Sequence, residues 1–187
     1  MSTNKQVKGA VILSAVAFTK RLDPNAWDTV HASLSQELRS ALPGVKAGSW
    51  YPVEYFAELL RGLYQLHKNP EEGGRAIREC GRFIGGDAAG TFLRLLIKIL
   101  TPAIFASKFP DFWNKYHNFG NSHADLTHIA ENRFVLFAEG YDHVHHIGAG
   151  WIDYVFDAFG KKVSVTTNAK VGDVSVPTVR WEVNWTA

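Results

Sequence analysis

The stretch ENRFVLFAEGYDHVHHIGAGWIDYVFDAFGKKVSVTT, residues 131–167, decides the fold, because it reads as strand, helix and strand in direct succession. Residues 133–138 form an apolar run that is typical of a buried strand. The helix predicted at 142–159 repeats its apolar residues at helical spacing and ends at Gly160. Residues 162–167 are then predicted to be a strand. This order favours a sheet with a helix packed against it.

Two flanking strands complete a C-terminal ββαββ unit. Residues 123–129 are predicted to form a hairpin with 133–138. The last strand, 178–186, pairs with 162–167 as a second hairpin and alternates apolar and polar residues. Its apolar positions are Val179, Trp181, Val183 and Trp185. Such alternation predicts an antiparallel sheet with one buried face.

The rest of the chain is predicted to be mainly helical. Residues 7–22 are rich in Val, Ile and Phe and are predicted to be a strand, with a helix as the alternative. Asp23-Pro24 predicts the start of a helix that runs to about Leu42. Further helices are predicted at 50–69, at 71–100 with a break near Gly85-Gly86-Asp87, and in two short pieces after Pro102 and Pro110. We therefore expect an α+β fold with a helical layer packed on a four- to five-stranded antiparallel sheet.

Composition limits the class of protein. The 187 residues suit one domain, and 46% hydrophobic residues suffice for a core, so we expect a flexible tail at 1–6 and a single domain at 7–187. The formal net charge of +2 gives no basic surface for nucleic acid. Cys80 is the only cysteine, which excludes an intramolecular disulfide and cysteine-based zinc ribbons. The most apolar stretch, residues 91–105, is interrupted by charges and Pro102, so we expect no transmembrane segment and a cytoplasmic location.

Six stretches resemble a known superfamily in their order and spacing, although none of them is specific alone. They are VKGAVILSAVAF, SWYPVEYFAELL, ECGRFIGGDAAGTFLRLL, TPAIFASKFPDFWNKYHNFG, IGAGWIDYVFDAFGKKVSVTT and VRWEV, and together they cover most of the chain. The superfamily groups heme-nitric-oxide-binding domains, 4-vinyl-reductase ligand-binding domains and TRAPP vesicle-tethering subunits. Within it, the chain is most similar to uncharacterised bacterial proteins of the 4-vinyl-reductase type.

The resemblance implies a helical layer on an antiparallel sheet, around a cavity for heme, a small hydrophobic molecule or an acyl chain. Most members of the superfamily sense or scaffold rather than catalyse. The resemblance makes the following residues candidates for the cavity wall: Phe92, Leu96, Phe105, Trp113, Trp151 and Tyr154. It also makes Cys80 a candidate for acylation, as in the TRAPP subunits, and the alternative is a small buried side chain.

The sequence departs from the superfamily in two motifs. Heme-nitric-oxide-binding domains carry a Tyr-x-Ser-x-Arg motif that grips the heme propionates, but here Tyr51 is followed by Pro-Val-Glu and Tyr141 by Asp-His-Val. Many 4-vinyl-reductase domains carry cysteines near the final hairpin, and this chain has Gly172-Asp173 there without a cysteine. We therefore expect neither heme nor a cysteine-bound metal.

A histidine cluster is the clearest candidate for metal chemistry. If a helix begins at Asp142, His143 and His146 are i,i+3 neighbours, while His145 points elsewhere. That spacing can present two or three ligands to zinc or another divalent ion, and His123 or His128 on the preceding hairpin could supply a further ligand. The alternative is an Asp142 N-cap followed by partly exposed histidines, and this is the interpretation that we expect to hold.

Two other patterns favour structural roles. The glycines at 81, 85, 86 and 90 match neither a dinucleotide motif nor a P-loop, so we expect them at a close helix contact or beside a cavity. Asp153 and Asp157 are i,i+4 carboxylates, and we expect them on a solvated helix face. No convincing catalytic arrangement is found.

Three functions remain. The leading prediction is a non-enzymatic cytoplasmic sensor or adaptor domain that binds a small hydrophobic ligand or a protein partner and forms a homodimer. The second is a metal-dependent protein or enzyme that uses His143, His146 and a hairpin histidine. The third is a pure interaction scaffold whose cavity is filled by its own side chains.

Overall fold

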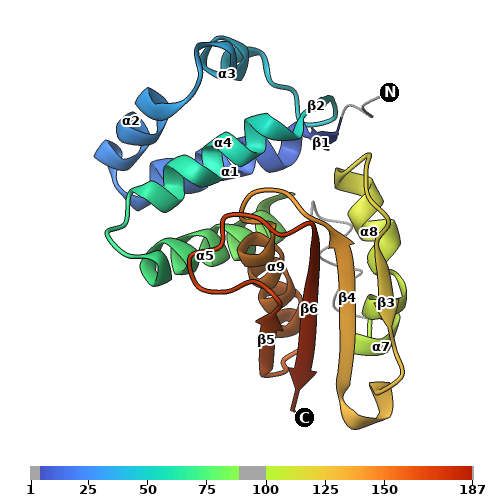
Figure 1. Cartoon of the computed structure of the whole chain (residues 1–187). Coiled ribbons are helices and arrows are strands. Elements are labelled where there is room, and N and C mark those ends of the chain that lie inside the picture. The colour runs from blue at the N-terminus through green and yellow to red at the C-terminus, as the bar shows by residue number, and fades with distance from the viewer. Residues whose placement is uncertain (1–4, 89–99, 187) are drawn as a thin grey trace.

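The C-terminal strands form a four-stranded antiparallel sheet in the order β3-β4-β6-β5, as the sequence predicts (Figure 1). The structure is a computed structural model, and it describes residues 5–88 and 100–186. In chain order the elements are β1 (Gln6–Lys8), α1 (Gly9–Leu22), α2 (Pro24–Ser33), α3 (Gln36–Ala41), β2 (Trp50–Pro52), α4 (Val53–Gln65), α5 (Pro70–Ala88), α7 (Pro102–Ser107), α8 (Phe109–Tyr116), β3 (His123–Asp125), β4 (Arg133–Glu139), α9 (Val144–Ala158), β5 (Val163–Thr167) and β6 (Thr178–Trp185).

The central strands β4 and β6 supply the buried face of the sheet. They pair over the whole length of β4, with Leu136 opposite Trp181. Alternate residues of β6 are buried, at the positions that its sequence pattern predicts: Val179, Trp181, Val183 and Trp185. This burial confirms the predicted register, because a shift by one residue would turn these side chains to solvent.

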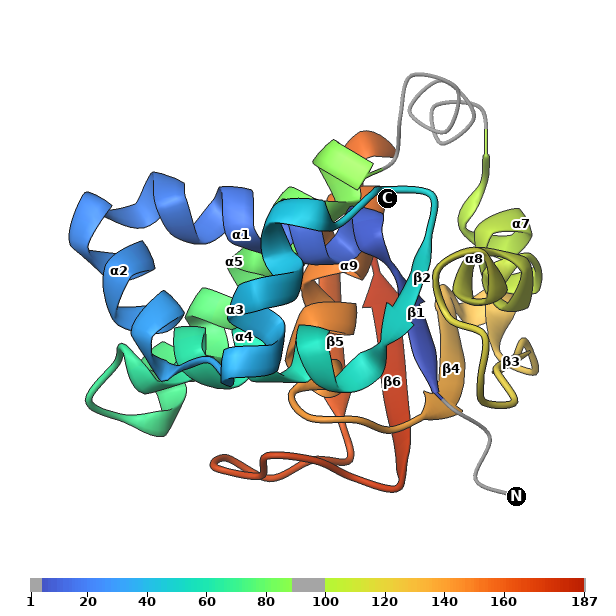
Figure 2. The same cartoon turned by 90° about the horizontal axis from the view of Figure 1, so that it is seen from above.

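The helices are arranged in layers on this sheet. Helix α9 packs on β5 and β6, α5 packs on α9, and α1 and α4 pack on α5 (Figure 1). Helices α7 and α8 flank the sheet at the β3 edge, as the view from above shows (Figure 2). The order of layers follows from the chain, since the apolar α9 connects the two hairpins and must cover the sheet.

Helices α5 and α9 approach each other closely at two glycines. A Cβ atom on Gly81 would lie 2.2 Å from the carbonyl oxygen of Ile147, and one on Gly150 would lie 1.8 Å from that of Arg78. Both obstacles are backbone atoms, which a rotamer change cannot move. Gly81 therefore serves close helix packing, as the sequence indicates, and Gly150, which the sequence pattern does not single out, does the same.

Helix α5 continues through the predicted break at Gly85-Gly86. Its last residue is Ala88, and the predicted continuation to residue 100 falls largely outside the described residues. Gly85 and Gly86 lie against the ring of Tyr154, where a Cβ on Gly85 would meet that ring at 2.8 Å. The two glycines make room for an aromatic ring rather than ending the helix.

The prediction of a strand at residues 7–22 is wrong. Only the first residues form the short strand β1, and Gly9–Leu22 is helix α1. Its buried side chains include Val11, Ile12, Ala15 and Phe18, whose spacing of three and four residues places them on one helix face. Packing of that face against the other helices overrides the strand preference of Val, Ile and Phe.

The helix predicted to start at Asp23-Pro24 does so, but it is split in two. The Asp23 carboxylate accepts a hydrogen bond from the backbone N–H of Asn25 at 2.9 Å. Helix α2 ends at Ser33, and Ser35 starts α3 by accepting from the N–H of Leu38 at 3.2 Å. A second N-cap inside the predicted helix produces the break.

Strand β1 attaches the start of the described chain to the body of the protein. Gln6, which the sequence assigns to a flexible tail, is the first residue of β1, and its N–H donates to Asn118 Oδ1 at 2.7 Å. Strand β1 pairs with β2, and Val7 forms an antiparallel bridge with His117. In the described part of the chain, no helix has the length and apolar character needed to cross a membrane.

Adding one methyl group at Gly150 is expected to destabilise the protein. Gly150→Ala would press a Cβ against the backbone of α5, so the free energy of unfolding should fall by about 1–3 kcal/mol, measured by urea denaturation. The matched control is Gly44→Ala, because no atom lies within 4 Å of a Cβ at that position. Equal stability of the two variants would contradict a close backbone contact at Gly150.

Candidate functional site

An apolar cavity of about 80 Å³ lies between the sheet and the helices α5, α8 and α9. Side chains from α1 and α4 also reach it, so residues far apart in the sequence meet there. Among the described residues its lining consists of Val11, Phe56, Gly81, Ile84, Phe109, Phe112, Trp113, Tyr116, His117, Tyr141, Val144, Ile147, Gly148, Trp151, Ile152 and Trp181. Most of these are aromatic or aliphatic, so the wall offers dispersion and hydrophobic contact rather than charge.

Helical periodicity explains which residues face the cavity. From α8 they are Phe109, Phe112, Trp113 and Tyr116, and from α9 they are Val144, Ile147, Gly148, Trp151 and Ile152. Within each helix these positions are three or four residues apart, so they form one face. Gly148 lets the sheet approach, since a Cβ there would meet the Trp181 ring at 2.3 Å.

The indole N–H groups in the wall are paired within the protein. Trp113 Nε1 donates to the carbonyl of Phe119 at 3.0 Å, and Trp181 Nε1 donates to that of His145 at 3.0 Å. These bonds hold the two rings in place and leave their apolar faces toward the cavity.

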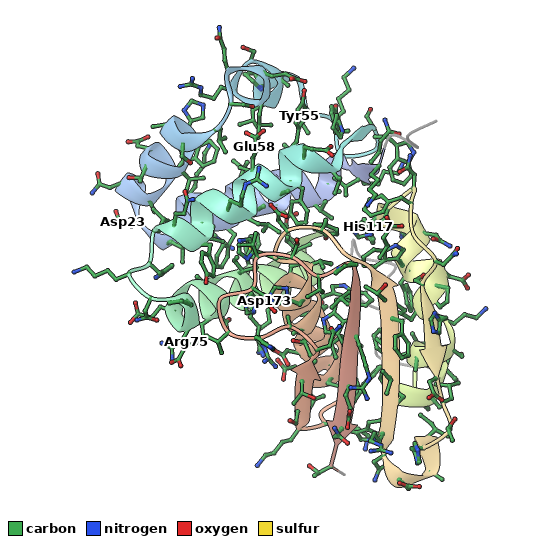
Figure 3. The ribbon with its side chains drawn as sticks, in the orientation of Figure 1. Asp23, Tyr55, Glu58, Arg75, His117 and Asp173 are labelled. Atoms are coloured by element: carbon green, nitrogen blue, oxygen red, sulfur yellow. The ribbon has the colours of Figure 1, made fainter. Side chains whose placement is uncertain are left out.

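His117 is the one imidazole among the described lining residues, and its ring is held on three sides. It follows α8 and lies beside the end of β4, near β1 (Figure 3). The ring stacks on Trp113 with 3.9 Å between centroids. Its Nδ1 lies 3.2 Å from the Trp113 carbonyl oxygen, and its Nε2 lies 3.3 Å from the Tyr141 hydroxyl. Burial lowers the pKa of His117 to about 4, although the bond to the Trp113 carbonyl opposes this shift.

Beside the cavity, at the start of α9, three imidazoles are packed together. His145 and His146 have ring centroids 4.1 Å apart, and His143 stacks on Tyr64 at 4.5 Å. His143 and His145 are almost completely buried. Gly74 makes room for the third ring, because a Cβ there would meet His146 at 2.6 Å. We call His143, His145 and His146 the histidine cluster.

The polar atoms of the histidine cluster are poorly satisfied. Nδ1 of His143 and both ring nitrogens of His145 are buried without a hydrogen-bond partner. His143 adopts a left-handed backbone conformation with φ 58°, and its N–H donates to the Val174 carbonyl oxygen at 2.6 Å. The loop between β5 and β6, residues 168–177, is therefore attached to the start of α9 beside the cluster.

Burial is the largest cause of the lowered pKa of each cluster histidine, which is about 4 in all three. Repulsion from the neighbouring imidazole adds to it, and Arg78 lowers the pKa of His146 further. Asp142 and Asp173 act in the opposite direction, on His143 and His145 respectively. The cluster is therefore neutral at pH 7.

The expected interpretation of this stretch, an Asp142 N-cap followed by partly exposed histidines, is wrong. The residue at the cap position is His143, which makes no side-chain capping bond, and Asp142 pairs with Arg61 of α4. His145, which was expected to point away, is buried against His146. His143 has a left-handed backbone and precedes the first residue of α9. The helical spacing assumed between His143 and His146 therefore does not hold.

The three predicted metal ligands are not brought together. His123 is exposed on the edge strand β3, where its ring stacks on Phe137 at 4.5 Å. No group of three His, Cys, Asp or Glu side chains within residues 5–88 and 100–186 is arranged to hold a metal ion. The positive end of α9 and the nearby Arg61 and Arg78 also disfavour a cation at the cluster.

Two of the six predicted cavity residues, Trp113 and Trp151, line the cavity. Phe105 is buried among other rings, including Phe134 and Phe156, and is outside the described lining. Tyr154 is also outside it, because its ring fills the space at Gly85. Phe92 and Leu96 lie outside the described residues.

Cys80 is fully buried in α5 and is also outside the described cavity lining. Burial raises the pKa of its thiol, so the sulfur stays protonated and a poor nucleophile. This environment matches the small buried side chain that was the alternative to acylation.

The sequence pattern predicts that both carboxylates of α9 are solvated, and this prediction is right for the exposed Asp157 but wrong for Asp153. Asp153 is 6% exposed and accepts two hydrogen bonds from Arg78, at 2.6 and 2.8 Å. Asp157 pairs with Arg82. Both arginines belong to α5, so these ion pairs flank the glycine contact between α5 and α9.

Sequence reasoning missed Phe56, His117, Tyr141 and Trp181 as cavity residues. The alternation of β6 placed Trp181 on the inner face, and that signal could have found it. No local sequence pattern distinguishes His117 and Tyr141. They meet because Val7 of β1 bridges to His117 after α8, and because the chain leaves β4 beside that bridge.

A comparison with solved structures finds H-NOX proteins, which are heme-nitric-oxide-binding, over nearly the full chain. The H-NOX protein from S. oneidensis in the Fe(II)NO ligation state matches with a TM-score of 0.69 and 11% identity, over 96% of this chain and 99% of that one. The Fe(II) unliganded H-NOX protein from K. algicida matches with a TM-score of 0.71 and 12% identity, over 96% and 97%. A variant H-NOX from T. Tengcongensis matches with a TM-score of 0.65 and 13% identity, over 96% and 98%.

At such low identity these matches establish the fold, and they confirm the architecture that the predicted superfamily implies. The placement nearest to 4-vinyl-reductase proteins stays a prediction. No protein-family model matches the sequence. No curated protein matches it either.

The described lining does not fit a heme, the group named in a study of heme distortion in the H-NOX family. The cavity of about 80 Å³ is well below the roughly 300–1,000 Å³ of pockets for larger ligands. No arginine or lysine among the described lining residues is available for propionates. Nδ1 of His117 faces the Trp113 carbonyl oxygen and the lone pair of Nε2 faces the Tyr141 hydroxyl, so both nitrogens already have partners within the protein.

Acid is expected to destabilise the fold through the histidine cluster. The pKa of each cluster histidine is about 4 in the folded protein, against an ordinary value of 6.5 that applies to the unfolded chain. Between these two pH values the unfolded chain therefore binds more protons than the folded protein. The stabilisation is complete above the unfolded pKa and is lost as the pH falls toward about 4. We expect a loss on the order of 1–3 kcal/mol per histidine, measured by urea denaturation between about pH 7 and about pH 4.5.

His145→Leu tests this assignment, because it should reduce the proton uptake on unfolding by about one proton. The control is His123→Leu, which changes an exposed histidine and should leave the pH dependence of stability as in the unmodified protein. An unchanged pH dependence in His145→Leu would refute the role of the cluster.

Proposed function

We propose that this chain is a sensor or adaptor domain that binds a small hydrophobic molecule in the aromatic cavity and does not act as an enzyme. The observation that carries the proposal is the cavity itself, with one face each of α8 and α9 turned toward it and Trp181 closing it from the sheet. Pockets lined mainly by apolar and aromatic groups with few polar atoms are typical of small-molecule sites.

The polar atoms of the described wall support binding rather than catalysis. Trp113 and Trp181 donate to backbone carbonyls, and His117 bonds to Tyr141. The lowered pKa of His117, about 4, leaves it unprotonated at pH 7. A general acid or base for chemistry near pH 7 needs a pKa closer to that pH.

The empty volume favours a ligand over a scaffold filled by its own side chains. Protein interiors are close-packed, and a void in an apolar wall forfeits contacts that a ligand can restore. A dry cavity of roughly 150 Å³, engineered in another protein, binds benzene. This cavity has about half that volume, so we propose a ligand of one ring or less, which displaces the side chains of the wall on entry, and not heme.

A sensor must also transmit the effect of ligand binding to a second molecule. We propose that the occupied domain alters its contact with a second copy of the chain or with a protein partner in the cytoplasm. Light scattering with and without toluene measures the first of these, and an unchanged mass in both conditions would leave the partner protein as the route. A metal-dependent function has no comparable support, because the predicted ligands lie apart.

Mass spectrometry tests whether the purified protein carries a ligand. The native spectrum should show a mass above that of the chain, and the excess should disappear on denaturation. If the mass is the same in both conditions and the protein also fails to bind toluene, the proposal is wrong.

Filling the cavity is expected to abolish ligand binding. Toluene at millimolar concentration should raise the Tm of the unmodified protein, as any ligand of the folded state does. Ile84→Phe places a larger side chain in the wall and should remove this increase. Ile104→Phe is the matched control, because Ile104 is 45% exposed and lies outside the lining. An equal increase in both variants would place the toluene site elsewhere.

A further inference from the structure

Two valines of the loop between β5 and β6 are exposed to solvent. Val171 is 74% exposed, more than any other large hydrophobic residue in the described part of the chain, and Val174 is 44% exposed. Lys170 lies beside them and is also exposed. The loop projects from the lower edge of the molecule in the view from above (Figure 2). We call residues 170–174 the loop tip.

Hydrogen bonds hold the loop tip in one conformation. The N–H of Lys170 donates to Asp173 Oδ2 at 2.7 Å, and the N–H of Asp173 donates to the Lys170 carbonyl at 3.1 Å. On one side of the tip the side chain of Asn168 bonds to the backbone of β6, and on the other the Val174 carbonyl accepts from the N–H of His143. A segment that is already fixed in this way loses little conformational freedom when it docks.

A groove of about 340 Å³ begins beside the loop tip, because residues 175–177 of the same loop form one of its walls. The start of α4 and the chain that follows β4 form the others. The aliphatic part of its lining consists of Val53, Ala57, Val176 and Pro177. Such a lining can bury the side chains of two valines.

The groove and the loop tip carry complementary charges. Most of the charged side chains in the groove are already paired within the protein: Lys5, Arg61 and Asp142. The remaining one, Glu54, is exposed and forms no ion pair with any described residue. At the tip, the carboxylate of Asp173 is bonded inside the turn, and the ammonium group of Lys170 has no partner in residues 5–88 and 100–186. The groove thus offers one carboxylate, and the tip offers one cation.

We propose that the loop tip of one copy of the chain docks in the groove of a second copy, with Val171 and Val174 on the aliphatic lining and Lys170 beside Glu54. The tip does not enter its own groove, since hydrogen bonds from His143 and Gly140 fix the loop at Val174 and Pro177. Each copy carries the tip and the groove next to each other. Two copies therefore exchange tips about a two-fold axis and form a closed dimer.

The docking goes beyond the proposed function, because it needs no ligand in the cavity. The two sites nevertheless share a wall residue, since Tyr141 lines both the cavity and the groove. A ligand that displaces this ring on entry would alter the dimer contact.

Sedimentation velocity of the full chain, from micromolar to millimolar concentration and without added ligand, tests the dimer. The mass should rise from one copy to two and no further. Val171→Ser should weaken the association about tenfold or more, because each dimer loses two buried valine side chains. Leu22→Ser is the matched control and should leave the association unchanged, since Leu22 is 47% exposed at the end of α1, outside the tip and the groove lining.

Charge reversal tests which groups meet. Lys170→Glu and Glu54→Lys should each weaken the association about tenfold, because repulsion replaces attraction in two ion pairs per dimer. The double variant should restore it. Lys170 takes part in the turn through its backbone alone, so its replacement keeps the tip intact. Circular dichroism checks the folding of Glu54→Lys, and if it is unfolded, the two tip variants decide the question.

The contrary results are distinct. A chain that stays single at every concentration overturns the proposal and leaves a different protein as the partner of the tip. A dimer that Val171→Ser does not weaken is formed through another surface. A double variant as weak as the single ones shows that Lys170 and Glu54 do not meet, and assemblies larger than two exclude the reciprocal exchange. Each of these results overturns the docking and leaves the cavity proposal standing, because the toluene experiment tests that site separately.

Discussion

The backbone contact between α5 and α9 at Gly81 and Gly150 is the constraint on which the rest of the structure depends. At these positions each helix lies directly on the main chain of the other, with no side chain between them. The ion pairs from Arg78 and Arg82 to the carboxylates of α9 hold the same crossing from its polar side. Because α5 and α9 are fixed to each other here, the crossing also sets the wall of the cavity, whose lining includes Gly81 and Ile147.

The sequence predicts the sheet and the helix covering it, because those elements carry regular patterns. The alternation of β6 and the helical repeat of α9 both reflect a single buried face, and both are found as expected. Residues 7–22 were predicted wrongly, since Val and Ile satisfy a buried helix as well as a strand. There the neighbouring layer, and not local preference, selects the helix.

The candidate site could be predicted only in part, because it is assembled from contacts between distant segments. Trp113 and Trp151 were identified by composition and resemblance, but His117 and Tyr141 meet across the end of β4 and a bridge to β1. The histidine cluster illustrates a second limit. Helical spacing assumes regular backbone, and the left-handed conformation of His143 rearranges the imidazoles that this spacing was meant to place.

Three of the side chains that enclose the cavity are tryptophans: Trp113, Trp151 and Trp181. They make up half of the six tryptophans in the chain. Indole emission responds to the polarity and the contacts around the ring, so a substantial part of the protein's intrinsic fluorescence originates at the cavity wall. The domain thus contains its own optical reporter of whether that space is empty, wet or filled, and it needs no attached dye.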